Sequence, residues 1–350
     1  MSRDLSGGNP DPDLLPDFSL LMKNAGNTKR GYEDPPDDPE LLRVLTRQYE
    51  GDKLPIGEVW LASGTFDAIA TIMRKTIAQG AVIGVEDPCF MTTLGFARQA
   101  GYGTYPMPVD EEGVTPDGLR AALSAGVKAV ILTPRAHNPM GGSWSDPRRA
   151  ALQEVINAHP DVLLIEDDHY AVLSRYPAVT LVEPERPMWA IIRSVSKYIG
   201  PDLRLAAVNS SRDLSRACLS FNAFTSRWVS SILQSAVLNV LTAPTYEKLV
   251  AAAATAYNRR RQMMLDALEA QGIAAFGRDG LNVWIPVADE QATMRWLLES
   301  GWTVRAGSIF RVSSSPAIRV TISGIDKEIA EDFARSLAAV RRYDLAERGA

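Results

Sequence analysis

Four short apolar runs recur between residues 81 and 196, and helix-forming segments precede and separate the first three of them. The apolar runs are AVIGVED (81–87), KAVILTP (128–134), VLLIEDD (162–168) and WAIIRSVS (189–196). The helix-forming segments cover residues 65–80, 89–101, 116–126 and 146–159. Strands that alternate with helices in this way predict an α/β fold with a mostly parallel central sheet and helices on both faces.

The remaining sequence suggests how the chain is divided. Pro, Gly and Asp are frequent at the start, which predicts an irregular arm, and Asp38-Pro39 predicts the first turn of a helix. A long helical pattern later ends at Gly272. We therefore expect an N-terminal arm (1–38), a large domain (39–243), a connecting helix (244–271) and a smaller α+β C-terminal domain that includes part of the arm (272–350).

Charge and cysteine content limit the classes of function. The 350 residues carry a formal net charge of -5, which argues against binding nucleic acid or an anionic membrane surface by bulk charge. Cys89 and Cys218 lie far apart without metal-ligand spacing, so we expect no metal site and a reducing compartment. No signal peptide or membrane-spanning run is evident, and a cytoplasmic location is the expectation.

Polar clusters follow three of the predicted strands, where ligands of open α/β sheets bind. They are TPRAHNPMGG (133–142), EDDHY (166–170) and SVSK (194–197). SGT (63–65) precedes a predicted helix and could cradle a phosphate, although a plain N-cap would look the same. Asp167 and Asp168 could equally pair with nearby arginines.

Lys197 stands out because the chain strongly prefers arginine. It has 8 lysines and 29 arginines, and this lysine follows an apolar strand, with serines before it and a proline and an arginine after it. A surface charge is the ordinary explanation for one lysine. Its setting favours a chemical role instead.

Taken in order, these motifs resemble the fold-type I pyridoxal-phosphate enzymes of the aspartate aminotransferase class. The match extends over nearly the whole chain. Its motifs are SGT (63–65), EDPCF (86–90), TPRAHNPMGG (133–142), EDDHY (166–170), SVSK with an arginine seven residues after the lysine (194–204), and IRVTIS (318–323). The resemblance implies pyridoxal 5′-phosphate as cofactor and an aminotransferase that acts on an amino acid and a 2-oxoacid.

The resemblance also implies catalytic roles. Lys197 would form the internal aldimine with the cofactor and then shuttle the proton. Asp167 would keep the pyridine nitrogen protonated. Asn138 and Tyr170 would hydrogen-bond the ring oxygen, although in some relatives the preceding position, here His169, makes that contact.

The other implied roles concern binding. The phosphate would be held by Ser63, Gly64, Thr65, Ser194, Ser196 and Arg204. Phe90 would stack on the ring, unless it is only a core aromatic. Arg319 would clamp the substrate carboxylate beside Gly8 and Asn138, unless it is a solvated edge residue. Tyr32 would reach the phosphate of a neighbouring subunit, which implies a homodimer.

The wording of three motifs narrows the resemblance further. TPRAHNPMGG, EDDH and RSVSKYIGPDLRLA are similar to the aminotransferase-like domain of MocR-type regulators. The first residues resemble the start of that domain, and no winged helix is expected before them. The chain is then either a stand-alone enzyme or an effector-sensing domain that binds the cofactor without turnover. β-Elimination, decarboxylation and oxidative deamination also remain open. Asp37, Phe66-Asp67 and Ala206 depart from the family pattern and leave the substrate open.

Overall fold

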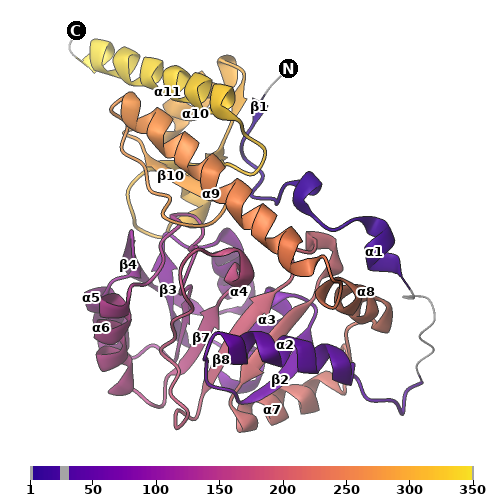
Figure 1. The fold of residues 1–350 in the computed structure, drawn as a ribbon. Coiled ribbons are helices and arrows are strands. Elements are labelled where there is room, and N and C mark those ends of the chain that lie inside the picture. The colour runs from indigo at the N-terminus through magenta and orange to yellow at the C-terminus, as the bar shows by residue number, and fades with distance from the viewer. Residues whose placement is uncertain (1–2, 24–30, 349–350) are drawn as a thin grey trace.

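The centre of the molecule is an eight-stranded sheet in the order β2-β9-β8-β7-β6-β3-β4-β5. The computed structural model describes residues 3–23 and 31–348 (Figure 1). The four predicted runs form neighbouring parallel strands, which confirms the expected fold class: β3 (Val82–Asp87), β6 (Ala129–Leu132), β7 (Leu163–Asp167) and β8 (Trp189–Ser194).

Four further strands extend this parallel centre. They are β2 (Glu58–Ala62), β4 (Gly103–Asp110), β5 (Gly113–Val114) and β9 (Ala206–Ser210). Strand β4 pairs in parallel with β3, whereas β9 is antiparallel to both β8 and β2. The sheet is therefore mixed but mostly parallel.

Helices cover both faces of the sheet because the strands bury side chains on both. In β8, Ile191 belongs to one core, while Ala190 and Ile192 belong to the other. The first core includes residues of α2 (Pro39–Gly51), α5 (Pro116–Ser124) and α6 (Asp146–Asn157). The second includes residues of α3 (Thr65–Thr76), α4 (Met91–Ala100) and α7 (Arg212–Asn222).

The predicted start of the first long helix is confirmed at atomic detail. The Asp38 carboxylate accepts hydrogen bonds from the backbone N–H groups of Glu40 and Leu41, and Pro39 occupies the first turn. Ser145 likewise caps α6 by accepting from the N–H of Arg148. Local sequence thus fixes where these helices begin.

A smaller antiparallel sheet stands above the large one in Figure 1. Its order is β10 (Asn282–Pro286), β13 (Ala317–Thr321) and β12 (Arg305–Ala306). The long helix α9 (Tyr246–Ala270) runs from this layer down towards α8 (Ser231–Leu241). Helices α10 (Glu290–Glu299) and α11 (Lys327–Arg348) complete the upper layer.

The N-terminal arm is not wholly irregular. It contains β1 (Arg3–Asp4), η1 (Pro12–Leu14) and α1 (Phe18–Met22), and β1 pairs in parallel with β11 (Trp302–Thr303). Short 3-10 turns lie at Ala171–Leu173, Pro201–Leu203 and Gly307–Phe310. Among the described residues, no helix has the length and apolar character needed to cross a membrane.

A buried ion-pair network fixes the strand ends beneath the predicted site. Asp168 accepts hydrogen bonds from Arg135 Nε at 2.7 Å and Arg193 Nε at 2.9 Å. Both arginines also donate to Asp52, just after α2. Burial alone would raise the pKa of Asp168, but the two guanidinium groups outweigh it and hold that pKa below its ordinary value. Asp168 is therefore a structural carboxylate.

Candidate active site

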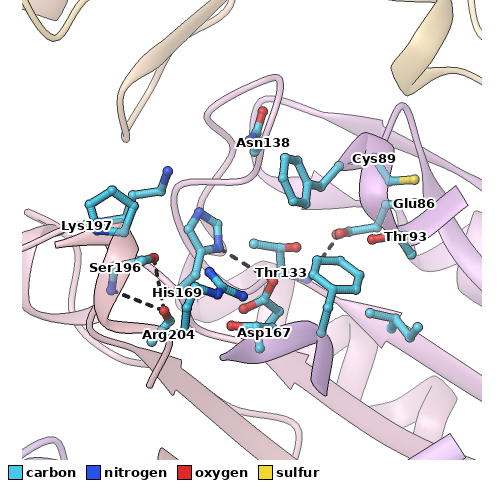
Figure 2. A pocket seen from close by; sticks show the side chains of 16 residues that line it. Glu86, Cys89, Thr93, Thr133, Asn138, Asp167, His169, Ser196, Lys197 and Arg204 are labelled. Atoms are coloured by element: carbon cyan, nitrogen blue, oxygen red, sulfur yellow. Dashed lines mark hydrogen bonds and ion pairs between the residues drawn. The ribbon is translucent and has the colours of Figure 1, made fainter. Parts of the chain in front are cut away.

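A pocket opens where β3, β6, β7 and β8 end, as the strand-end clusters predict (Figure 2). Eight of the residues predicted from the motifs line it. They are Thr65, Phe90, Asn138, Asp167, Ser194, Ser196, Lys197 and Arg204. Because they come from helix α3 and several strand ends, only the folded sheet brings them together.

Lys197 enters the pocket from the loop after β8. Its Nζ donates a hydrogen bond to the carbonyl of Gly8 at 2.9 Å. The side chain is half-buried. Desolvation of the amine and the positive charge of Arg319 lower the pKa of Lys197 to about 8, despite the opposing charge of Asp167. A far larger fraction of this amine is therefore neutral, and nucleophilic, near neutral pH than of an ordinary lysine.

Asp167 faces the pocket with an unpaired oxygen. Its Oδ1 is buried and has no hydrogen-bond partner among the described residues, in contrast to the fully engaged carboxylate of Asp168. Burial and the negative charge of Asp168 raise the pKa of Asp167 to about 7. A buried acceptor without a partner costs free energy, so this side chain is prepared for a donor that a ligand brings.

One end of the pocket has the features of an anion site. Helix α3 starts at Thr65 after Gly64 and has no side-chain cap, so its first N–H groups are free of a capping side chain. Gly64 has φ +95°, and a Cβ there would lie 2.5 Å from Arg204 Nη2. The hydroxyls of Ser194 and Ser196 are hydrogen-bonded to each other at 2.9 Å. Donors from three segments therefore converge at this end of the pocket.

Tyr170 does not reach the pocket, and its neighbour His169 does. Tyr170 is buried, and its pKa is raised by this burial and by the charge of Asp279, against the opposing charge of Arg261. Its hydroxyl has no hydrogen-bond partner among the described residues. His169 lines the pocket, with Nδ1 3.8 Å from Asp167 Oδ2. Consecutive residues after a strand point in different directions, and here the second of the two points inward to the core.

The pKa of His169 determines whether its imidazole ring is charged or neutral. Burial, then the positive charge of Lys197, lowers the pKa of His169 to about 4. The ring is therefore neutral at pH 7, so it can donate one hydrogen bond and accept another. Of the two residues that the EDDHY motif offers for the ring oxygen, His169 is therefore the one that lines this pocket.

Arg319 is a buried residue rather than a solvated edge residue. It lies on β13, the central strand of the small sheet, and is 2% exposed. Its guanidinium donates to Asn138 Oδ1 at 3.2 Å and to the carbonyl of Ser6 at 2.8 Å. Gly8 passes so close that a Cβ there would lie 2.9 Å from Nη2. Gly8, Asn138 and Arg319 are thus brought together beside Lys197.

Ser63 and Tyr32 lie outside the pocket lining as well. Ser63 is exposed, and its N–H donates to the carboxylate of Asp67. Tyr32 is 74% exposed and stacks edge-on against Trp228. Ser63 thus lies at the surface just before the start of α3. Tyr32 does not line the pocket of its own chain. Its exposed position is compatible with a contact to the pocket of a neighbouring subunit.

Several pocket residues had no role assigned to them from the sequence. They are Phe66, Glu86, Cys89, Thr93, Ile131, Thr133 and Pro201. Glu86 is buried, accepts from the N–H of Thr133, and has its pKa raised by burial to about 8. His137 is buried, with its Nε2 3.4 Å from Glu86 Oε2. Glu86 could have been identified from the sequence, because it directly follows the apolar run AVIGV in the predicted strand and a glutamate is rarely buried without a partner.

Comparisons with known proteins agree with this geometry. The aminotransferase class I and II family matches residues 4–337. The vitamin B6 salvage pathway transcriptional repressor PtsJ of Salmonella typhimurium is 43% identical over 331 residues, which cover 93% of this chain and 76% of the repressor. The aspartate/prephenate aminotransferase of Cereibacter sphaeroides is 27% identical, covering 95% of this chain and 89% of that enzyme.

Solved structures share the fold. An archaeal alanine:glyoxylate aminotransferase superposes with a TM-score of 0.88 at 24% identity, covering 98% of this chain and 91% of that one. LysN, an α-aminoadipate aminotransferase of Thermus thermophilus in complex with N-(5′-phosphopyridoxyl)-L-leucine, gives 0.86 at 21% identity, covering 99% and 93%. At such identities the likeness establishes architecture only.

The two adjacent aspartates should respond oppositely to mutation in cofactor-free protein. Because the folded-state pKa of Asp167 is raised, the folded state holds a proton that the unfolded state releases, and stability falls as pH rises from about 4 to about 7. Asp167→Asn should make that decline shallower by removing the contribution of this one carboxyl group. Asp168→Asn should instead cost about 3–5 kcal/mol of unfolding free energy, because two buried guanidinium groups lose their partner.

Urea unfolding at a series of pH values measures both effects. An unchanged pH dependence in Asp167→Asn, or an Asp168→Asn protein as stable as the wild type, would contradict these assignments.

Proposed function

Because the chain belongs to the aminotransferase class I and II family, we propose that it is an enzyme that removes the amino group of an amino acid, with transamination as the reaction. Pyridoxal 5′-phosphate is the cofactor. The observation that carries the proposal is the pairing, in one pocket, of Lys197, whose pKa is lowered to about 8, with Asp167, whose buried oxygen lacks a partner.

The unmet polar groups of the pocket fit this cofactor. The uncapped start of α3, the two serine hydroxyls and Arg204 suit a phosphate. The free Oδ1 of Asp167 suits the N–H of a protonated pyridine. His169 and Asn138 line the same pocket and suit the ring hydroxyl. Asp167 Oδ1 and the uncapped start of α3 would each gain a partner that the described side chains do not provide.

When bound, the cofactor supplies an aldehyde that captures amines and a ring that accepts electrons from the substrate Cα. Lys197 Nζ is the amine that would hold the aldehyde. When neutral and free, the same Nζ would be able to accept a proton from the substrate Cα and give it back. Asp167 would pair with a protonated ring nitrogen, and that positive charge would favour the ionised form of its carboxyl group. Arg319 binds the substrate carboxylate, and Phe66 and Phe90, 5.8 Å apart, restrict water.

A second function has its own support. The relative at 43% identity is a transcriptional repressor, and its name assigns it to vitamin B6 salvage. This chain would then be a sensing domain that binds the cofactor without turnover. Lys197, Asp167 and Arg319 suit either function, so the distinction lies in whether the amino group leaves the substrate.

Product formation separates the two functions. Cofactor-loaded protein mixed with L-amino acids, without an acceptor, should release stoichiometric 2-oxoacid and convert the cofactor to its amine form, measured by mass spectrometry. Asp167→Asn should slow the conversion at least about 100-fold, because the ring loses its negative partner. A spectral change on amino acid binding with no 2-oxoacid would favour the sensing function instead.

We also propose a homodimer in which Tyr32 of each subunit completes the other pocket. Tyr32 is exposed, and Arg227 lies 4.9 Å from its ring. Phe224, 89% exposed, lies in the same connection between α7 and α8 and adds apolar surface. Such a cluster is suited to burial against a second copy.

Mixed dimers test the exchange of Tyr32. Tyr32→Ala should remain dimeric in sedimentation but bind the cofactor more weakly, because a phosphate contact is lost. In a mixed dimer of Tyr32→Ala and Lys197→Ala subunits, the Lys197-containing pocket receives an intact Tyr32 and should recover its affinity. A monomeric wild-type protein with full cofactor occupancy, or no recovery in the mixed dimer, would exclude this arrangement.

A further inference from the structure

A second arginine, Arg305, stands beside Arg319, which itself contacts the pocket residue Asn138. The register of the small sheet places Arg305 of β12 directly opposite Arg319 of β13. Directly opposite residues of an antiparallel pair lie on the same face of the sheet. Both side chains reach the same acceptor, since Arg305 Nε donates to the carbonyl of Ser6 at 3.1 Å and Arg319 Nη2 at 2.8 Å.

Neither guanidinium has a carboxylate partner. In the described part of the chain, no carboxylate oxygen lies within 4 Å of Arg305 or Arg319. Asp4 is near enough for Arg305 to help lower its pKa, but its carboxylate accepts from the N–H of Ser6. Two cations that share one neutral carbonyl are left without compensating charge.

Other half-buried arginines in this third of the chain are neutralised. Arg260 lies 2.8 Å from Asp11, Arg278 lies 3.0 Å from Glu112, and Arg311 lies 3.2 Å from Glu290. Placing Arg305 next to Arg319 without an anion carries a repulsive cost, which a ligand can remove. Arg319 Nε is also buried without a partner. The missing counter-charge is therefore expected from the ligand.

A single carboxylate bound by Arg319 would leave the charge of Arg305 uncompensated. Arg319 already has the geometry for the α-carboxylate, beside Asn138, Gly8 and Lys197. The bonds to Ser6 place a nitrogen of Arg305 within about 6 Å of one of Arg319. Arg305 is half-buried, so its outer nitrogens can meet a group that arrives from solvent. A short amino acid with a second anionic group matches this spacing.

We propose that Arg305 is a specificity-determining residue, which binds the anionic side-chain group of an acidic amino acid whose α-carboxylate is held by Arg319. The inference rests on the proposed function, since it names the substrate class of that same site. In binding, the acidic group replaces the carbonyl of Ser6 as acceptor for Arg305. No bond to carbon is made or broken by this residue.

Isosteric ligand pairs test the proposal on cofactor-loaded protein. L-Glutamate is compared with L-glutamine and L-aspartate with L-asparagine, and dissociation constants are taken from the change in cofactor absorbance. A charge-assisted hydrogen bond corresponds to about a 10- to 100-fold preference for the acidic member of each pair. Arg305→Met should abolish the preference by weakening only the acids, whereas Arg305→Lys should keep part of it.

The exposed Arg295 provides a matched control, because Arg295→Met removes one positive charge from the same region away from the pair. It should leave the preference unchanged. Retained cofactor absorbance and circular dichroism establish that each variant is folded. If Arg305→Met does not fold, the ligand preference is measured on Arg305→Lys instead.

Three results would overturn the proposal. Equal affinity for acids and amides in the wild type excludes a second anionic group. Equal weakening of both members in Arg305→Met would place Arg305 at the α-carboxylate. A preference that survives Arg305→Met would assign it to another residue. Failure of every amino acid to bind would instead contradict the proposed function, and the inference with it.

Discussion

The ion-pair network of Asp168 with Arg135 and Arg193 is the interaction on which the site depends. It joins the loop after β6, the end of β7 and the end of β8 below the pocket floor. Asp52 extends it to the end of α2. Burying these charges is favourable only with near-complete pairing, so the strand ends have little freedom to move apart. Because Asp168 satisfies both arginines, Asp167 next to it remains unpaired and faces the pocket.

The site above this network combines groups whose charges are incompletely compensated. Lys197 and Arg319 both have lowered pKa values, caused first by burial and then by positive neighbours. Asp167 has a raised pKa for the corresponding reasons of burial and the charge of Asp168. A pyridinium N–H would compensate the charge of Asp167, and a substrate carboxylate would compensate the charge of Arg319. The uncompensated charges of these side chains are thus the physical origin of the site's affinity for such a ligand.

Much of the parallel sheet was predictable because its strands are buried on both faces and stand out as apolar runs. Strand β4 was missed because GTYPMPVD contains Pro106 and Pro108. These prolines are tolerated because β5 pairs only with the last two residues of β4. The ordered motifs identified most of the pocket. They could not decide between His169 and Tyr170, because the two residues are adjacent after β7 and only the folded backbone determines which side chain faces the pocket and which faces the core. Arg305 carried no motif, and only the register with Arg319 reveals it.

The central claim, that Lys197 is the amine that holds the cofactor, is tested by reducing cofactor-loaded protein with borohydride and mapping the modified peptide by mass spectrometry. The account predicts one pyridoxyl-phosphate label on the peptide containing Lys197, out of 8 lysines in the chain. It also predicts no label in Lys197→Ala, which should still fold. A label on another lysine, or labelling that persists unchanged in Lys197→Ala, would contradict the account.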